Sequence, residues 1–439
     1  MESLLPSPAI AIVGRHNSGK TTLVEKLISQ LVQRGLDVGS IKHHSHSGFE
    51  IDIPGKDSYR HRQAGASETV ISSPGQMALV KTIEGELECS QLVERMPGHD
   101  IVIVEGYRKS GLATIEVMRA GNPADEEVAA AFLEAAQRGD DLTTDFVQLG
   151  RARQQGMVWG TRSADGVEVH AAASSNDLAH SDNIQNKMPT AHTLAVVTDI
   201  PAAAQAAALY QLECFGLNDI TKLCDFLVQR VARPRISLVI QAGGQSKRMG
   251  QSKATVSFGG RPLISRIVER MLPVADEMII TTNEAEQLAF LTKEFPQASL
   301  RLVPDVLDER GALPGLLTAL SAASYDYVAL VACDMVNASA RLIAAESIEL
   351  HLSQADCVVP VNQHGYEPFQ AVYYRPAILP ALKQALAAGE KRMQDVFAKV
   401  HLEPFPQARV KQVEPAGGCF VNVNTPEELA AAERNFLED

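Results

Sequence analysis

Residues 14–22 read GRHNSGKTT, and this stretch decides the fold expected for the first half of the chain. Gly14, Gly19, Lys20 and Thr21 fit the pattern G-x-x-x-x-G-K-S/T, in which the backbone N–H groups of a glycine-rich loop surround phosphate oxygens. The apolar run AIAIV before the loop predicts a strand, and the amphipathic stretch TTLVEKLISQLVQRG after it predicts a helix. Strand, loop and helix in this order indicate a nucleotide-binding α/β domain, whereas an ordinary glycine-rich turn is the alternative interpretation.

The polar residues of this loop have distinct expected roles. The Lys20 ammonium is placed to neutralise the β- and γ-phosphates, and the Thr21 hydroxyl is placed to bind Mg²⁺. The other loop residues that we expect at the nucleotide are Gly14, Asn17, Ser18, Gly19 and Thr22. Further along the chain, the apolar strand HDIVIVEGY carries Glu105 at its carboxyl end, which is the edge of an α/β sheet where ligands bind. Glu105 is therefore a candidate for the metal or its water, with a surface carboxylate as the alternative.

A polar stretch between these two elements raises the question of a metal site. Its three histidines, His43, His44 and His46, have a spacing that fits no four-ligand zinc site, and no cysteine is near them. We expect instead a loop that gathers a metal-bound phosphate and an anionic partner through the charged residues Asp52, Lys56, Asp57, Arg60 and Arg62.

A second glycine-rich stretch, QAGGQSKRMGQSK, spans residues 241–253 after another apolar run. Its spacing differs from that of the first loop, so the two are not repeats of one another. We expect a triphosphate to lie against the loop residues Gln241, Ala242, Gly243 and Gly244. Arg248 and Lys253 follow, and Lys253 is placed to counter the charge that develops on a leaving pyrophosphate. A surface loop with incidental basic residues is the alternative interpretation.

The rest of the second half adds polar residues at the ends of expected strands. The buried run VALVACD ends in Asp334, an oxygen ligand of the kind that Mg²⁺ prefers. Asn283 and Asp305 follow two further expected strands. Asn422 and Asn424 precede a predicted helix, and for both asparagines a role in holding the turn is the alternative.

Composition narrows the class of protein. The 439 residues, 45% hydrophobic and 21% charged, indicate a soluble globular chain of at least two domains. The net charge of −13 weighs against nonspecific binding to nucleic acid. The apolar runs are too short to cross a bilayer, and the start of the chain shows no signal peptide, so we expect no membrane association. Six cysteines that occur singly favour reduced thiols and a cytoplasmic protein.

Strand-like and helix-like stretches alternate almost throughout, which favours two Rossmann-like α/β domains of three layers each. A predicted helix ends shortly before Pro234, a residue poorly tolerated inside helices, so we expect domains over residues 1–232 and 233–439. Within the first domain, residues 121–190 lose their apolar periodicity after one alanine-rich helix, which is typical of an insertion. The role of this insertion, and whether the chain forms a homo-oligomer, stay open.

The segments GRHNSGKTTLVEKLI, IDIPGKDSYRHRQAGA and DIVIVEGYRKSG together resemble the GTP-binding adaptor protein of molybdopterin-guanine dinucleotide biosynthesis. The resemblance runs over about residues 9–119 and resumes at residues 194–199. It implies a P-loop fold that binds GTP, hydrolyses it weakly and assists a partner transferase. Residues 121–190 have no recognised counterpart in that family. Whether this chain packs into the family's usual dimer is therefore an open question.

Residues 236–439 resemble the molybdenum cofactor guanylyltransferase. Their loop is similar to the nucleotidyltransferase signature L-A-G-G-x-S-x-R-M-G-x-D-K, with Gln241 in place of Leu and Ser252 in place of Asp. Another departure is Ala312, where the family tends to have proline. The resemblance implies that GTP binds at the loop of Gln241, Ala242, Gly243 and Gly244, and at Lys253, Asn283, Asp305 and Asp334.

Together the two resemblances imply a fusion of adaptor and transferase. The expected reaction is GMP transfer from GTP to molybdenum-molybdopterin, with Mg²⁺ as cofactor and pyrophosphate as the second product. The expected catalytic residues are Arg248, Lys253 and Asp334, and the expected metal ligands are Thr21, Glu105 and Asp334. GTP, molybdopterin, apo-molybdoenzymes and their chaperones are the expected partners. A molybdopterin cytidylyltransferase, a sugar-phosphate nucleotidyltransferase and a non-catalytic GTP-binding scaffold that carries the cofactor are the alternatives.

Overall fold

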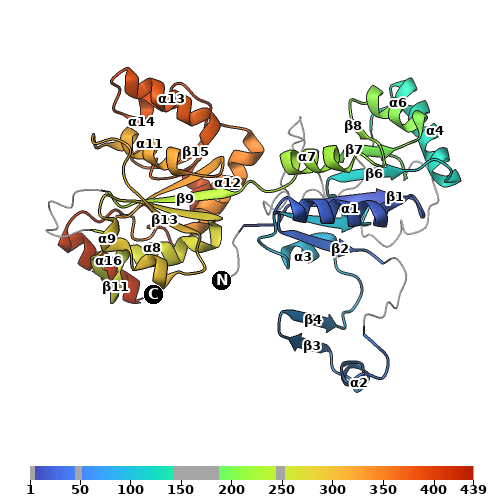
Figure 1. The fold of residues 1–439 in the computed structure, drawn as a ribbon, viewed down its shortest axis with the longest axis horizontal. Coiled ribbons are helices and arrows are strands. Elements are labelled where there is room, and N and C mark those ends of the chain that lie inside the picture. Colours follow the sequence, from blue (N-terminus) through green and yellow to red (C-terminus); the bar gives the residue numbers. More distant parts are fainter. Residues whose placement is uncertain (1–4, 45–51, 143–186, 244–252, 439) are drawn as a thin grey trace.

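The computed structural model describes residues 5–44, 52–142, 187–243 and 253–438, which form two α/β domains side by side (Figure 1). Gly244 and Arg248 of the second glycine-rich loop lie outside the described residues. The same holds for His46 and for most of the predicted insertion, residues 143–186.

The first domain is built on a six-stranded parallel sheet with the order β2-β5-β1-β6-β7-β8. Its strands are β1 (Ala9–Gly14), β2 (Val38–Lys42), β5 (Ile101–Glu105), β6 (Thr114–Met118), β7 (Thr193–Thr198) and β8 (Glu213–Phe215). The continuous apolar run of β1 is buried, because helices cover a parallel sheet on both faces. The strand predicted before the phosphate loop is thereby confirmed.

Helices complete the three layers of this domain. One face carries α1 (Lys20–Gln33) and α7 (Ile220–Arg230), which pack Leu27 and Leu227 onto the sheet. The other face carries α3 (Cys89–Glu94), α4 (Pro123–Arg138) and α6 (Pro201–Leu209). Phe132 of α4 is fully buried in this layer, so the alanine-rich helix at the start of residues 121–190 belongs to the core. We therefore restrict the proposed insertion to the residues after α4.

A small subdomain stands apart from the first sheet (Figure 1). It consists of α2 (Asp57–Gln63) and the antiparallel hairpin β3 (Glu68–Ser73) and β4 (Gln76–Lys81). Four of the five charged residues expected to gather a phosphate pair with one another here. Arg62 lies 3.7 Å from Asp52, and Arg60 lies 3.7 Å from Asp57. The structure therefore does not bring them to the phosphate loop.

The second domain has an eight-stranded mixed sheet with the order β13-β12-β9-β14-β17-β15-β16, and β18 pairs with β15. Its strands are β9 (Ile236–Gln241), β12 (Glu277–Thr281), β13 (Leu300–Val303), β14 (Tyr327–Ala332), β15 (Cys357–Asn362), β16 (Gly365–Tyr366), β17 (Gln370–Tyr374) and β18 (Leu402–Phe405). Strands β9, β12, β13 and β14 run parallel, whereas β17 is antiparallel to β14. A separate two-stranded ribbon is formed by β10 (Ser257–Phe258) and β11 (Arg261–Pro262).

Two helical layers cover this sheet. The first contains α8 (Leu263–Met271), the 3₁₀ helix η3 (Leu272–Val274), α9 (Ala285–Leu288), α10 (Leu291–Glu294), α12 (Ala340–Ser353), α15 (Gln407–Val413) and α16 (Pro426–Glu438). The second contains α11 (Ala312–Ala322), α13 (Arg375–Ala387) and α14 (Met393–Phe397). The Ser339 side chain caps α12 by accepting a hydrogen bond from the Leu342 N–H, the usual device at a helix start. Across the residues that the structure describes, no helix combines the length and apolar character needed to cross a membrane.

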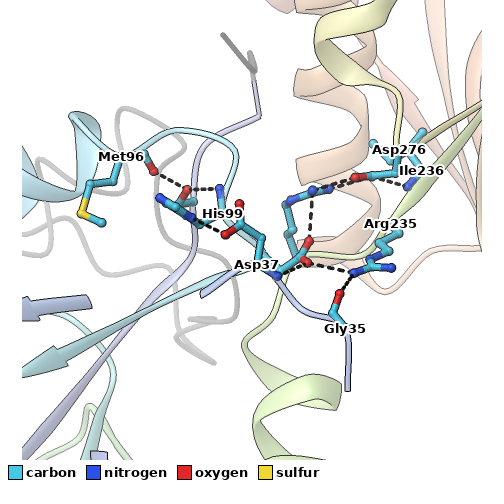
Figure 2. A network of polar contacts seen from close by, with 10 residues as sticks. Gly35, Asp37, Met96, His99, Arg235, Ile236 and Asp276 are labelled. Carbon is cyan, nitrogen blue, oxygen red and sulfur yellow. Dashed lines mark hydrogen bonds and ion pairs between the residues drawn. The ribbon is translucent and has the colours of Figure 1, made fainter. Parts of the chain in front are cut away.

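The two domains are joined by an interdomain cluster of Asp100, Arg233, Arg235 and Asp276 (Figure 2). The Arg233 side chain is 7% exposed and lies between two carboxylates, 3.0 Å from Asp100 and 2.7 Å from Asp276. Arg235 lies 3.1 Å from Asp100 and also donates to the Gly35 carbonyl. Because Asp100 precedes β5 and Asp276 precedes β12, the cluster joins the amino ends of strands from both sheets.

This joint determines where the two candidate sites lie. The parallel strands of each sheet run away from the cluster, so their carboxyl ends face apart. With five residues in β5 and six in β9, each strand carries its carboxyl end about 16 to 20 Å from the cluster at ~3.3 Å per residue. The phosphate loop and the second glycine-rich loop therefore lie at opposite ends of the molecule.

Glu277 organises the amino end of the second sheet. Its side chain is 7% exposed and accepts hydrogen bonds from the Ser237 hydroxyl at 2.7 Å and the Ser324 hydroxyl at 2.7 Å. The Arg301 Nε also donates to it at 3.0 Å. Burial raises the pKa of Glu277, but these donors together outweigh burial, so the net pKa lies below its ordinary value.

Replacing Arg233 with methionine should weaken the joint between the domains. Losing the cation leaves Asp276 without its ion pair and Asp100 with Arg235 alone, and breaking a buried pair in this way costs about 3 to 5 kcal/mol. We expect differential scanning calorimetry to show two separated unfolding transitions in Arg233→Met. The matched control is Arg230→Met, which removes an exposed arginine at the end of α7. An unchanged thermogram for Arg233→Met would contradict a stabilising role for the cluster.

Glu277→Gln should lower the free energy of unfolding by about 2 to 3 kcal/mol at pH 7, because charged hydrogen bonds are replaced by neutral ones. The lowered pKa means that this contribution is fully present above the ordinary value of 4.5. The contribution disappears as the pH falls through the lower folded-state pKa. Urea unfolding at a series of pH values measures it, with Glu286→Gln on the exposed side of α9 as control. A wild-type minus variant difference that grows in acid would contradict the assignment.

Candidate functional site

A cavity of about 470 Å³ opens at the carboxyl ends of the parallel strands of the second sheet. The cavity is lined by residues that the sequence analysis predicted from separate parts of the chain. These are Gln241, Ala242, Gly243, Lys253, Asp305, Asp334, Asn422 and Asn424. The parallel strands explain why they meet, because loops that follow neighbouring parallel strands share one edge of the sheet. The cavity is large enough to enclose a nucleotide-sized ligand.

Lys253 lies at the centre of the polar wall. Its Nζ donates to Asn424 Oδ1 at 2.8 Å and lies 3.2 Å from Asp334 Oδ2. The Asp334 carbonyl accepts a hydrogen bond from the Val423 N–H at 2.9 Å, which fixes the segment of the two asparagines against the end of β14. A lysine, a carboxylate and an amide are thereby held together over a sequence separation of more than 170 residues.

Asp305 is a second carboxylate in the cavity wall. The Asn283 side chain donates to Asp305 Oδ2 at 2.8 Å and accepts from the Asp305 N–H at 3.0 Å. Asn283 thus holds Asp305 from behind and is not itself among the residues that line the cavity. A Cβ added to Gly243 would lie 3.1 Å from Asp305 Oδ2, so the glycine allows this close approach.

Gln241, which lines the same cavity, carries a side-chain hydrogen-bond donor without an acceptor among the described residues. This donor, Nε2, is buried. Such a donor is costly unless a ligand or water completes it. This orphaned group is the kind of feature expected in a site that binds a polar ligand.

Several lining residues were missed by the sequence interpretation, and Glu309, Arg310 and Phe369 are three of them. Glu309 and Arg310 lie in the turn before α11, and Phe369 precedes β17. Nothing in the pattern DERGALPG separates a lining arginine from a solvated one, because only the path of the turn decides it. Phe369 follows a short hairpin, for which the sequence predicts no nearby ligand.

The phosphate loop of the first domain has the expected strand–loop–helix geometry. A Cβ added to Gly14 would lie 2.4 Å from the Val117 carbonyl oxygen, so only glycine fits at this position. Gly19 has a φ of 90° and precedes the first residue of α1, Lys20. The Lys20 Nζ donates to the Arg15 carbonyl at 2.5 Å and thus folds back over the loop.

The predicted pair of Thr21 and Glu105 is brought together at the mouth of this loop. Thr21 Oγ1 donates to Glu105 Oε1 at 2.7 Å. Lys42, at the end of β2, lies 3.1 Å from both Glu105 oxygens. Lys42 was missed, although its position at a strand end is the same signal that identified Glu105. Asn17 and Thr22 are exposed at the loop, whereas Ser18 is fully buried beneath it.

Two sets of charged side chains surround Lys20, which are the carboxylates of Glu105 and Asp125 and the ion pair of Arg108 with Glu116. Burial lowers the pKa of Lys20, and the carboxylates of Glu105 and Asp125 oppose this. Behind them, Arg108 forms a bidentate ion pair with Glu116 of β6, whose side chain is 2% exposed. Burial raises the pKa of Glu116 despite the opposing effect of Arg108. The first site is therefore a cation beside hydroxyl and carboxylate oxygens, which suits a metal-bound phosphate.

Two protein-family models match this chain. Molybdopterin guanine dinucleotide synthesis protein B matches residues 9–134, and the MobA-like NTP transferase domain matches residues 238–406. The first match includes most of α4. The two matches fall on the two sheets of the structure, one on each.

Individual related proteins also match either a transferase or an adapter part of the chain. A molybdenum cofactor guanylyltransferase of Desulfosudis oleivorans is 32% identical over 198 residues, which are 44% of this chain and 93% of that protein. A molybdopterin-guanine dinucleotide biosynthesis adapter protein of Escherichia coli is 40% identical over 118 residues, which are 26% of this chain and 67% of that protein.

Among solved structures, molybdopterin-guanine dinucleotide biosynthesis protein A from Archaeoglobus fulgidus is similar to 46% of this chain over 100% of its own length. Its identity is 20% and its TM-score is 0.41, so the sequence relatives carry the assignment. The chain belongs to the molybdenum cofactor guanylyltransferase family, with a molybdopterin-guanine dinucleotide biosynthesis adaptor domain fused ahead of the transferase domain, and it acts in molybdenum cofactor biosynthesis.

Proposed function

We propose that the cavity around Lys253 transfers GMP from GTP to molybdenum-molybdopterin and that the phosphate loop of the first domain holds a second GTP. The observation that carries the first part is the contact of Lys253 with Asp334 and Asn424 inside a nucleotide-sized cavity. The orphaned Gln241 donor and the adjacent Gly243 backbone support a triphosphate in the same place.

The proposed reaction needs no general base. The terminal phosphate oxygen of molybdopterin is already an anion and attacks the α-phosphorus of GTP directly. A new P–O bond forms there, the bond from the α-phosphorus to the bridging oxygen breaks, and pyrophosphate leaves with the electron pair. Lys253 neutralises charge that develops on the leaving group, and the loop backbone orients the triphosphate.

The residues present fit a Mg²⁺ ion at the transferase site. Asp334 and Asn424 offer hard oxygen ligands on one side of the cavity, and Mg²⁺ bound to a nucleotide requires few protein ligands. Among the described residues, no group of three or more acidic, histidine or cysteine side chains is placed to hold a metal ion, so phosphate and water would supply the remaining ligands. When bound there, Mg²⁺ stabilises negative charge on the transferring phosphate.

At the first site we propose GTP binding with weak hydrolysis. Lys20 would exchange its hydrogen bond with the Arg15 carbonyl for phosphate oxygens, and Thr21 with Glu105 would hold the metal or its water. We further propose the domain boundary at residues 232 and 233, a cytoplasmic location, and apo-molybdoenzymes or their chaperones as recipients of the product.

The separation of the two loops supports independent roles for the two GTP molecules. Both loops lie at the carboxyl edges of sheets whose amino edges meet, so a nucleotide at one loop cannot reach the other within the same chain. The GTP at the first loop is therefore not the one that is cut.

The reaction and its nucleotide are tested in one experiment. The full chain is incubated with molybdenum-molybdopterin and each radiolabelled nucleoside triphosphate in turn, and pyrophosphate and labelled dinucleotide are measured. We expect product with GTP. Product with CTP instead would favour the cytidylyltransferase alternative, and no product with any nucleotide would favour a non-catalytic scaffold.

Lys253→Ala should lower the rate of dinucleotide formation a few hundredfold, because one charge at a leaving group is worth roughly 3 to 4 kcal/mol in the transition state. Asp334→Ala should be at least as harmful, since it removes the proposed metal ligand. Steady-state kinetics measure both variants, and Lys293→Ala on exposed α10 is the control. A Lys253→Ala enzyme within tenfold of wild type would contradict the proposed role.

Lys20→Ala should abolish GTP hydrolysis and nucleotide binding at the first loop and leave dinucleotide formation in vitro largely intact. The physical reason is that Lys20 would contact only the triphosphate of the first loop. Phosphate release without molybdopterin measures the first effect, and dinucleotide formation with molybdopterin measures the second. If Lys20→Ala slows transfer as much as Lys253→Ala does, the two sites are not independent.

A further inference from the structure

The first turn of α4 reaches the phosphate loop through a buried carboxylate. Asp125 is 0% exposed, and its Oδ1 lies 3.1 Å from Ser18 Oγ, inside the loop. Its Oδ2 accepts a hydrogen bond from the Arg119 N–H at 3.1 Å. The carboxylate thus ties the end of β6 and the start of α4 to the underside of the loop.

Asn122 makes a second connection from the same turn. Its Nδ2 donates to the His16 carbonyl at 2.9 Å and to Asp125 Oδ2 at 2.9 Å. Asn122 and Asp125 are therefore hydrogen-bonded to each other and each reaches a different point of the loop. The spacing Asn-x-x-Asp places both side chains on one turn, because residues three apart are neighbours on a helix.

These contacts involve loop groups that a bound nucleotide does not need, namely backbone carbonyls and the Ser18 hydroxyl. A phosphate loop keeps its N–H groups available for phosphate oxygens, so the loop cannot be held through those donors before the nucleotide arrives. Its carbonyl oxygens and the Ser18 hydroxyl remain as points of attachment. Asn122 uses the His16 carbonyl, Asp125 contacts Ser18, and Ser18 Oγ also lies 2.5 Å from the Arg15 carbonyl.

The backbone of the loop needs such support. Asn17 has a φ of 63°, a left-handed conformation that is uncommon outside glycine, although asparagine adopts it more readily than most residues. The N-cap of α1, Gly19, has no side chain to accept the free N–H groups of the first turn. We expect a loop with these features to keep its shape only when neighbouring groups hold it.

We propose that Asn122 and Asp125 are positioning residues that hold the phosphate loop in its nucleotide-binding shape. The proposal rests on the proposed GTP site at that loop. Neither side chain is assigned a contact with the nucleotide, since Asp125 is buried beneath the loop and Asn122 is directed to a loop carbonyl. By holding the loop in place beforehand, they lower the entropy cost of ordering the loop when GTP binds.

The test follows the loop itself in the full-length chain. Hydrogen–deuterium exchange of the peptide that contains residues 14–22 is measured while MgGTP is titrated, which gives a dissociation constant for this loop apart from the transferase site. Asp125→Ala is compared with the conservative Asp125→Asn, which keeps an acceptor and nearly the same shape. Glu126→Gln is the matched control, because it removes an exposed charge from the same helical turn.

We expect Asp125→Ala to weaken MgGTP protection of the loop by about 10- to 100-fold, since several buried hydrogen bonds are lost. Asp125→Asn should stay within about fivefold of wild type, and Glu126→Gln should equal wild type. The loop of Asp125→Ala should also exchange faster without nucleotide, while dinucleotide formation stays unchanged. Asn122→Ala, at a less buried position, should weaken protection about 5- to 10-fold and serves if Asp125→Ala does not fold.

Two results would overturn the proposal, and they are distinguishable. In the first, Asp125→Ala and Asn122→Ala both bind MgGTP at the loop with wild-type affinity, while Lys20→Ala loses protection. The GTP site would then be supported, but the positioning role would be contradicted. Undiminished protection in Lys20→Ala would remove the GTP site itself and the positioning role with it.

Discussion

The ion pairs of Arg233 with Asp100 and Asp276 are the constraint on which the arrangement of this molecule depends. A buried charge cluster adds little net stability over an apolar one, but it penalises any arrangement that leaves a member alone in the protein interior. Here the members precede strands of both sheets, so the amino edges must meet (Figure 2). Since ligands bind at the carboxyl edges of such sheets, both sites are left open to solvent and directed apart.

The two lysines that we propose as phosphate ligands are held differently, and the difference follows from the elements on which they lie. Lys20 is the first residue of α1 and donates to a loop carbonyl, a neutral partner that is exchanged easily for phosphate. Lys253 lies beside Asp334, a charged partner on another strand end. A phosphate that approaches Lys253 thus meets a carboxylate as well, which a metal ion would neutralise. These different partners support our proposal that the first loop binds its nucleotide reversibly and that the second site uses a metal ion.

Local sequence determined a large part of this fold. The run AIAIV and the loop GRHNSGKTT specify β1, the phosphate loop and α1, because a buried parallel strand and a glycine-rich turn each have a local signature. The same reasoning placed Glu105, Asp305 and Asp334 at or shortly after strand ends, where the structure has them. The resemblance to two families then supplied the division of the chain into an adaptor and a transferase.

Tertiary structure decided what no local pattern encodes. The contact between Lys253 and Asn424 joins residues 171 positions apart, and it depends on which strands are neighbours in the second sheet. The sequence analysis assigned no role to Asp125, yet it is the buried residue that reaches Ser18 across 107 positions. Four of the charged residues around α2, which the sequence suggested for phosphate, pair with one another because that subdomain stands away from the sheet. Sequence thus determined the chemistry available at each strand end, whereas the order of the strands and the joint at Arg233 decided which of these groups meet, because such contacts arise only when distant segments pack together.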